Sequence, residues 1–279
     1  MNDPVMRIAR ASVERFGTET PVPADQPGAD SLARMLEHRS HRRYSERPVA
    51  PELLRLLFAC AFSAPSKSDL QQADVVHIND PVKRKTIADL IPDNPWVRTA
   101  PVFLIFCGDN RRTRQVAELR GKPFANDHLD AFMNSAVDAG IVLASFIHAA
   151  EAARLGCCPI SSVRNHSQAV SDLLELPDWV FPLAGLCVGY PSETGMITSR
   201  LGLDVTVHTD RFDDSTIATK IDAYDRRRLA RQQYKSQRDV ARFGTAELYG
   251  WSEDKARQYA KPERADFGAF IRGKKFDLS

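Results

Sequence analysis

Clusters of basic and hydroxyl side chains are the residues of this sequence best suited to chemistry, because they could hold an anionic ligand. Residues 38–43 read HRSHRR, in which five of six side chains are basic or can become so. Arginine forks match phosphate oxygens in pairs, and serine adds a further donor. Loop spacing lets Arg39, Ser40 and Arg42 converge on one phosphate, and Arg200 is a second candidate phosphate ligand. Taken alone, such a basic run is more often a solvated surface.

Two further stretches offer small or polar groups to a planar ligand. Residues 64–71 (APSKSDLQ) follow an apolar segment, and Gln71 carries both a donor and an acceptor, which suits a ring that displays both. Residues 160–165 (ISSVRN) follow a short apolar run, and their consecutive small side chains let backbone amides approach a ligand closely. Either stretch alone is typical of an ordinary loop.

Several common kinds of site are missing from the sequence. No GxGxxG, GxxxxGK[ST], GxSxG or HExxH motif is present, which disfavours a Rossmann dinucleotide site, a P-loop, a serine hydrolase and a zinc protease. The five cysteines form no CxxC pair and no Cys/His cluster has ligand spacing, so we expect buried, reduced thiols and no metal. No side chain is assigned as a catalytic acid, base or nucleophile.

The composition is that of an ordinary globular protein with a basic C-terminal part. The 279 residues are 43% hydrophobic and 27% charged, with a net charge of +2. Residues 220–279 hold 15 Lys/Arg against 9 Asp/Glu, a surplus that could serve a phosphorylated ligand or nucleic acid. The first residues lack the apolar core of a signal peptide, and the uncharged run 139–150 is too short to cross a bilayer, so we expect a cytoplasmic protein.

Hydrophobic periodicity predicts alternating helices and a few buried strands, and therefore a mixed sheet flanked by helices. The segment 126–155 is apolar on nearly all sides over part of its length, which predicts a central buried helix. Expected helices are 30–37, 51–64, 81–91, 126–155, 167–176, 222–243, 252–260 and 264–272, and expected strands are 75–78, 101–107, 157–160 and 182–189. Three domains are expected: an irregular lead-in over 1–29, a core over 30–215 and a helical C-terminal extension over 216–279.

Taken together in this order, the motifs resemble the nitroreductase family, and most closely its NADPH-preferring branch of oxygen-insensitive nitroreductases and NADPH–flavin oxidoreductases. HRSHRRY at 38–44 is similar to the family's R-R-S-x-R-x-F signature, and 64–71 is similar to its A-P-S-x-x-N-x-Q turn. ISSVRN at 160–165 resembles I-G-G-x-R-N, GLCVGYP at 185–191 is nearly the branch's own wording, and SRL at 199–201 resembles P-R-L. The resemblance covers roughly residues 30 to 275.

The resemblance implies an α+β fold and an intertwined homodimer that holds FMN at its interface, with C-terminal arms that embrace the partner. It implies that Arg39, Ser40, Arg42 and Arg200 hold the FMN phosphate, that residues 66–71 contact the ribityl chain and ring, and that 160–162 lie near N5. The full set of implied flavin ligands is His38, Arg39, Ser40, Arg42, Ser66, Ser68, Asp69, Gln71, Ser145, Ile160, Ser161, Ser162 and Arg200. The implied NAD(P)H ligands are Lys235, Lys261 and Arg264.

The implied function is an FMN-dependent NAD(P)H oxidoreductase that reduces nitroaromatics, quinones or free flavin by ping-pong hydride transfer. Either NADPH or NADH could be the donor. Another flavin-dependent activity of the superfamily is the first alternative: enone reduction, reductive dehalogenation or oxygen-dependent flavin chemistry. A flavin-binding protein without turnover is a second alternative. An anion- or nucleic-acid-binding module that uses the basic segments is a remote third, because no DNA- or RNA-binding motif accompanies them.

Overall fold

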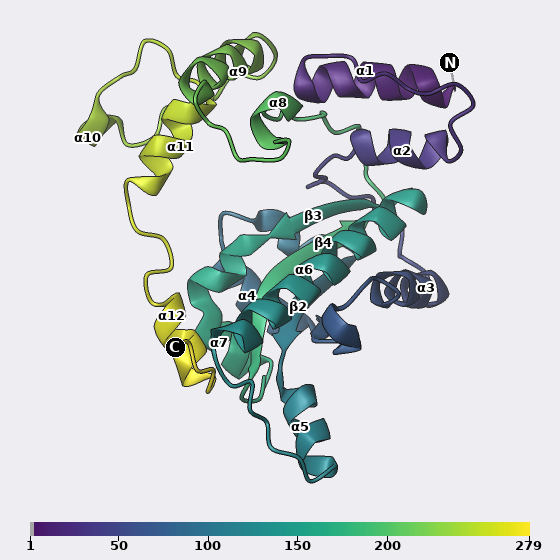
Figure 1. Cartoon of the computed structure of the whole chain (residues 1–279), viewed down its shortest axis with the longest axis vertical. Helices are drawn as coiled ribbons and strands as arrows, with labels where there is room; N and C mark the ends of the chain where they lie inside the picture. Colours follow the sequence, from purple (N-terminus) through teal and green to yellow (C-terminus); the bar gives the residue numbers. More distant parts are fainter. Residues whose placement is uncertain (1–2) are drawn as a thin grey trace. The chain divides into compact units, whose positions relative to one another are not determined.

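The computed structural model describes residues 3–279, which form two compact units (Figure 1). The sheet unit comprises residues 40–195 and 264–279, and the helical unit comprises residues 3–39 and 196–263. Neither unit is a continuous stretch of chain. This division differs from the expected domains, because the last residues of the predicted C-terminal extension belong to the sheet unit.

A four-stranded sheet forms the centre of the sheet unit, in the order β1-β2-β4-β3. The strands are β1 (Ala73–His77), β2 (Val102–Asp109), β3 (Gly156–Ile160) and β4 (Val180–Gly189), and every neighbouring pair is antiparallel. The predicted α+β fold with helices around a sheet is confirmed, but these four strands form an antiparallel sheet where a mixed one was expected. A helical crossover does join β2 and β3, which point the same way, but β4 inserts between them and runs in the opposite direction. Within the described residues, the isolated bridge between Ser40 and Cys157 adds a parallel pairing at the β3 edge.

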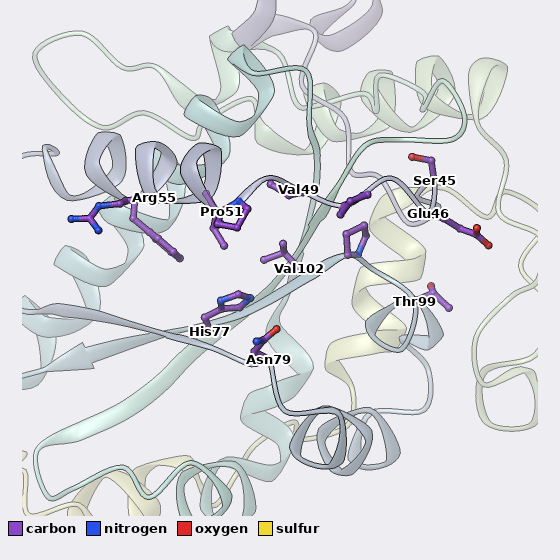
Figure 2. Close-up of a pocket in the computed structure, with 13 residues that line it drawn as sticks. Ser45, Glu46, Val49, Pro51, Arg55, His77, Asn79, Thr99 and Val102 are labelled. Atoms are coloured by element: carbon purple, nitrogen blue, oxygen red, sulfur yellow. The ribbon is translucent and has the colours of Figure 1, made fainter.

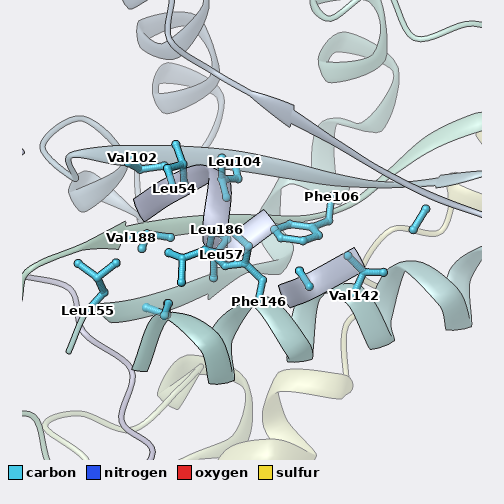
Figure 3. Close-up of a cluster of buried hydrophobic side chains, with 14 of the residues drawn as sticks. Leu54, Leu57, Val102, Leu104, Phe106, Val142, Phe146, Leu155, Leu186 and Val188 are labelled. Carbon is cyan, nitrogen blue, oxygen red and sulfur yellow. The ribbon is translucent and has the colours of Figure 1, made fainter. Parts of the chain in front are cut away.

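The helix α6 (Leu129–Ala152) covers one face of the sheet, and α3 (Pro51–Phe62) packs beside it. Figure 3 shows their shared core, in which Phe146 of α6 meets Phe106 of β2 with ring centroids 5.9 Å apart. Alternate residues of β2 face opposite sides, so Phe103 and Ile105 enter a second core on the other face. Burial of β2 on both faces explains its continuous apolar sequence.

The predicted central burial of α6 is correct on one side only. Ala139 and Phe146 are fully buried, whereas Met133 and Val137 are 56% and 48% exposed. By length and composition, α6 is also apolar enough to cross a membrane, but helices at the centre of soluble folds often share that property. An apolar stripe therefore remains on the outer surface of α6 in the single chain.

Within the described residues, the sheet unit contains seven further elements, of which three agree with expected helices to within a few residues (Pro81–Leu90, Ser167–Leu173 and Phe267–Gly273). The seven are η1 (Lys67–Asp69), α4 (Pro81–Leu90), η2 (Pro95–Val97), α5 (Arg111–Leu119), η3 (Ser161–His166), α7 (Ser167–Leu173) and α12 (Phe267–Gly273). Phe270 and Phe276, from α12 and the residues after it, join Phe181 of β4 in a third buried cluster. Four cysteines are buried free thiols, as expected, but Cys60 is exposed on α3.

The helical unit contains a helix that the sequence did not reveal. Its elements are α1 (Pro4–Phe16), α2 (Ala29–Leu36), α8 (Leu203–Thr206), α9 (Ile217–Arg231), α10 (Val240–Phe243) and α11 (Trp251–Tyr259). The predicted irregular lead-in over 1–29 is thus wrong for α1, which starts at the N-cap Asp3 and ends at Gly17, where φ is +83°. The predicted helix over 222–243 is also wrong in its second half, because Gln232 leaves helical geometry.

Candidate functional site

The loop of residues 66–72, which leads into β1, is held in place by one buried carboxylate. Asp138 of α6 is 2% exposed and accepts hydrogen bonds from Ser66 Oγ (2.7 Å), Lys67 N (3.1 Å) and Gln72 N (3.2 Å). Ser66 Oγ in turn accepts from Gln71 N at 2.7 Å. The sequence analysis did not single out Asp138, because an aspartate within an apolar helix carries no recognisable motif.

The same loop presents polar side chains from a rare backbone conformation. Ser68, Asp69 and Gln71 all have positive φ, at 49°, 57° and 53°, and all three are exposed. Three such residues close together are unusual and often mark a ligand site. Ser66, Asp69 and Gln71 also line a cavity of about 400 Å³ against α6. The structure therefore brings the four predicted loop ligands together.

A second group of polar side chains gathers where β3 ends and η3 begins. Asn94 donates through Nδ2 to Ser162 Oγ at 2.8 Å, and Arg264 donates through Nε to Asn165 Oδ1 at 2.7 Å. The Ser161 hydroxyl lies 3.5 Å from Arg264 Nη2. Ile160 is 2% exposed with its side chain in the core, so only its backbone can meet a ligand at this point.

The basic segment reaches this second group through a pairing along β3. Ser40 bridges to Cys157, and His41 N donates to the Cys157 carbonyl at 2.8 Å. Arg42 follows directly after His41, and its guanidinium lies over the Trp96 ring, 5.2 Å from the ring centroid. The sequence analysis missed Trp96 and Asn94, which lie in or next to the single turn η2, too short to give a periodic pattern.

Arg39 and Arg200 belong to the helical unit, and protein acceptors do not use all of their guanidinium N–H donors. Arg39 donates through Nη1 to the Glu37 carbonyl at 3.0 Å, while its buried Nε has no partner among the described residues. Arg200 is exposed and donates to Thr198 Oγ1 at 2.7 Å. Within residues 3–279, no carboxylate lies within ion-pair distance of Arg42 or Arg200. Guanidinium groups without a carboxylate partner fit the phosphate of FMN.

The two ligand groups of the sheet unit lie at opposite edges of the sheet. The 66–72 loop enters β1 and the 160–165 segment leaves β3, and these are the outer strands. Three interstrand spacings, or roughly 14 Å, separate them. That separation is wider than a ring system of three fused six-membered rings. The two groups therefore do not lie next to each other in the single chain.

The remaining predicted residues are more scattered. Lys235 is exposed, and Lys261 forms an ion pair with Asp239 at 2.8 Å. His38 is partly buried at the end of α2, with its carbonyl accepting from Arg15, and Ser145 is partly exposed on α6.

A larger cavity of about 590 Å³ lies elsewhere in the sheet unit (Figure 2). Its polar lining residues are Arg55 of α3, His77 and Asn79 at and just after the end of β1, and Ser45, Glu46 and Thr99. Burial, with a smaller effect of Arg84, lowers the pKa of His77. None of the predicted flavin ligands lines this cavity, so size alone does not identify the site.

A pair of carboxylates beside the 66–72 loop makes the free energy of unfolding depend on pH. Arg112 donates to Asp74 (2.6 Å) and to the Gln71 carbonyl, and its Nη2 lies 3.2 Å from Asp109. Burial, and then the neighbouring Asp109, raise the pKa of Asp74 from 3.8 to about 6. The folded state therefore holds this proton more tightly than the unfolded state, and the stabilisation present below pH 3.8 is lost as pH rises through 6.

Asp74→Asn is accordingly expected to be more stable than the wild type at pH 8, by about 1 kcal/mol after allowing for solvent screening. The advantage should disappear towards pH 4, since the wild-type carboxyl is then neutral as well. Urea unfolding of both proteins at pH 4.5, 6 and 8 measures this difference, with the exposed Asp222→Asn as control. An advantage that grows on acidification would contradict the assignment.

Comparison with known proteins identifies the family. The pattern described as the nitroreductase family matches residues 35–190, and that of the nitroreductase family C-terminal domain matches residues 199–279. This chain belongs to the nitroreductase family. A Bacillus subtilis (strain 168) protein named as an NAD(P)H FMN reductase is 35% identical over 230 residues, which cover 81% of this chain and 90% of the relative.

Solved nitroreductase structures share the fold. B. megaterium NfrA2 superposes with a TM-score of 0.80 at 30% identity, covering 89% of this chain and 98% of that one. The NADPH:FMN oxidoreductase from Vibrio harveyi, solved with NAD⁺, has a TM-score of 0.75 at 26% identity and covers 88% and 97%. These findings confirm the predicted family and the predicted class, an FMN-dependent NAD(P)H oxidoreductase.

Proposed function

We propose that two copies of this chain form a homodimer that uses bound FMN to reduce nitroaromatics, quinones or free flavin at the expense of NADPH or NADH. When bound, FMN would supply reversible hydride transfer at its N5 position. The observation that carries the proposal is the placement of complementary ligand groups at opposite edges of one sheet. In a dimer, the 66–72 loop of one copy can face the 160–165 segment of the other across one flavin.

The protein's part in binding begins with the phosphate. Arg39, Ser40, Arg42 and Arg200 supply guanidinium and hydroxyl donors, and His38 precedes them. A dianionic phosphate gains most from guanidinium groups whose charge is not already neutralised by carboxylates. The contact of Arg42 with the Trp96 ring limits its rotamers, which lowers the entropy lost on binding.

The ring would be held by small polar groups on either side. On one side are the Ile160 backbone, Ser161 and Ser162, with Asn94 holding the Ser162 hydroxyl. On the other are Ser66, Ser68, Asp69 and Gln71 of the partner copy, together with Ser145. Gln71 Nε2 donates to Asp69 Oδ1 at 3.2 Å, which offsets part of the carboxylate's charge beside an electron-rich ring.

The dimer interface would include the exposed apolar stripe of α6. Met133 and Val137 are four residues apart and Ala144 follows after seven more, so the three side chains share one face of the helix. All three are exposed in the single chain. Leu56 and Phe62 of α3 are likewise exposed. Large apolar side chains grouped in this way are typical of protein interfaces.

The C-terminal extension, residues 216–279, would embrace the partner and bind NAD(P)H. Arg264 already contacts the segment assigned to the flavin ring, while Lys235 and Lys261 offer charge for a 2′-phosphate. The five free thiols suit the reducing cytoplasm, where we place the protein.

Spectroscopy and stopped-flow mixing test the function. The purified protein is expected to be yellow and dimeric, and anaerobic mixing with NADPH should bleach the flavin band in a saturable, single-phase reaction. NADPH is expected to bind more tightly than NADH if the basic extension recognises the 2′-phosphate. A protein that stays colourless after FMN is added, or a bound flavin that neither coenzyme reduces, would refute the proposal.

A further inference from the structure

The helix α1 lies outside both segments that match the family, since these begin at residues 35 and 199. Nevertheless, its last turn is fixed to the two phosphate-arginine segments of the helical unit. Arg15, in that turn, is only 6% exposed, which is unusual for an arginine. Its guanidinium is therefore held by the protein and is not a solvated surface charge.

Arg15 binds the chain directly before Arg39. Its Nε and Nη2 donate to the Leu36 carbonyl at 3.0 and 2.9 Å, and Nη2 also donates to the His38 carbonyl at 2.6 Å. These bonds fix the peptide that ends α2 and enters the basic segment. The direction in which Arg39 leaves the backbone is thus set by a side chain of α1.

Arg15 also binds the chain around Arg200. Its Nη1 donates to the Thr198 carbonyl at 3.2 Å, and its own carbonyl accepts from Arg200 N at 2.7 Å. One residue therefore joins two segments that are more than 150 positions apart in sequence and each carry a phosphate arginine. A planar guanidinium with five donors can make such a set of bonds, whereas an ammonium cannot reproduce its geometry.

The end of α1 is itself fixed by α9. Arg227 donates through Nη2 to the Arg200 carbonyl at 2.5 Å and lies 3.5 Å from the Arg15 carbonyl. Arg231 donates to the carbonyl of Glu14 and pairs with its carboxylate at 3.2 Å. The last turn of α1 is thus held from both sides, so Arg15 has a defined position from which to act.

We propose that Arg15 is a positioning residue for FMN binding: it holds Arg39 and Arg200 in the geometry that receives the phosphate. This inference rests on the proposed function, in which those two arginines bind that phosphate. A preorganised pair of guanidinium groups loses less freedom when the anion arrives and so binds it more tightly. Arg15 itself need not touch FMN.

The test compares FMN with riboflavin, which has the same ring and ribityl chain but no phosphate. Dissociation constants are measured by flavin-fluorescence quenching on the full-length apoprotein. Arg15→Met is expected to weaken FMN binding about tenfold, because a displaced Arg39 or Arg200 would lose the equivalent of one charge-assisted hydrogen bond to the phosphate. Riboflavin binding should stay within about twofold of the wild type. Arg15→Lys should lose a similar amount of FMN affinity. Arg10→Met, on the same helix and 65% exposed, is the matched control and should bind both ligands as the wild type does.

A double-mutant cycle separates positioning from general damage. With Arg39 and Arg200 both replaced by Met, adding Arg15→Met should change FMN affinity by less than about twofold. Equal losses for FMN and riboflavin, or an unchanged tenfold loss in the doubly substituted background, would overturn the inference. A wild-type protein that binds riboflavin as tightly as FMN would instead refute the phosphate site of the proposed function.

Discussion

Val137→Glu is expected to convert the protein into monomers and to abolish FMN binding. Val137 is 48% exposed on α6, so in a single chain a glutamate at this position would meet water at little cost. In the proposed homodimer, the same carboxylate would be buried in the interface, once in each copy. An unpaired buried charge costs roughly 3–5 kcal/mol, and the dimer would contain two.

Light scattering after gel filtration measures the dimer, and absorbance of the eluted protein measures bound flavin. Val82→Glu is the matched control, because Val82 is 71% exposed in the first turn of α4, where a carboxylate is well tolerated. The control should stay dimeric and yellow. A Val137→Glu protein that remains a flavin-loaded dimer would show that this stripe of α6 is not the interface.

The parts of the fold that the sequence predicted are those in which one apolar pattern dominates. β2, β4 and α6 are long and apolar, so their existence and approximate ends follow from composition. The direction of the strands does not, because an alternation of helices and strands fits both a parallel sheet and the observed order with β4 inserted between β2 and β3. Pairing is decided by contacts between distant segments.

The helix α1 escaped prediction for a related reason. Its buried face comprises Ile8, Ala11, Ser12 and Arg15, so it contains one large apolar residue and a charge. The helix is amphipathic, but its buried face is short of large apolar residues, and the burial of Arg15 depends on carbonyl partners near residues 36 and 198. Only a three-dimensional structure can supply those partners.

In the candidate site, too, some residues could be recognised from the sequence and others could not. The arginines and the serine of the basic segment were recognisable because only a few residue types can bind a phosphate well. Asn94, Trp96 and Asp138 were not, because each acts on another residue of the site. Residues that position ligands are chosen by local geometry, and many residue types can fill that role.

Asp138→Ala is the second substitution expected to have a large effect. Removing the carboxylate leaves the Ser66 hydroxyl and the amides of Lys67 and Gln72 without their acceptor, and the Gln72 amide is buried. Each unsatisfied buried donor costs about 1–3 kcal/mol, so we expect a loss of about 3 kcal/mol in the free energy of unfolding. FMN affinity should fall as well, since Ser68, Asp69 and Gln71 hold their positive φ only while the loop is fixed.

Urea denaturation and FMN titration measure the two effects separately. Asp138→Asn should lie between wild type and Asp138→Ala, because its amide oxygen still accepts while its NH₂ group faces donors. Asp130→Ala is the control on the same helix: Asp130 is exposed and pairs with Lys67 of the same loop at 3.2 Å, so it should leave the unfolding midpoint unchanged. If Asp138→Ala unfolded at the wild-type urea concentration, the carboxylate could not be what fixes the 66–72 loop, and its positive-φ residues would need another support.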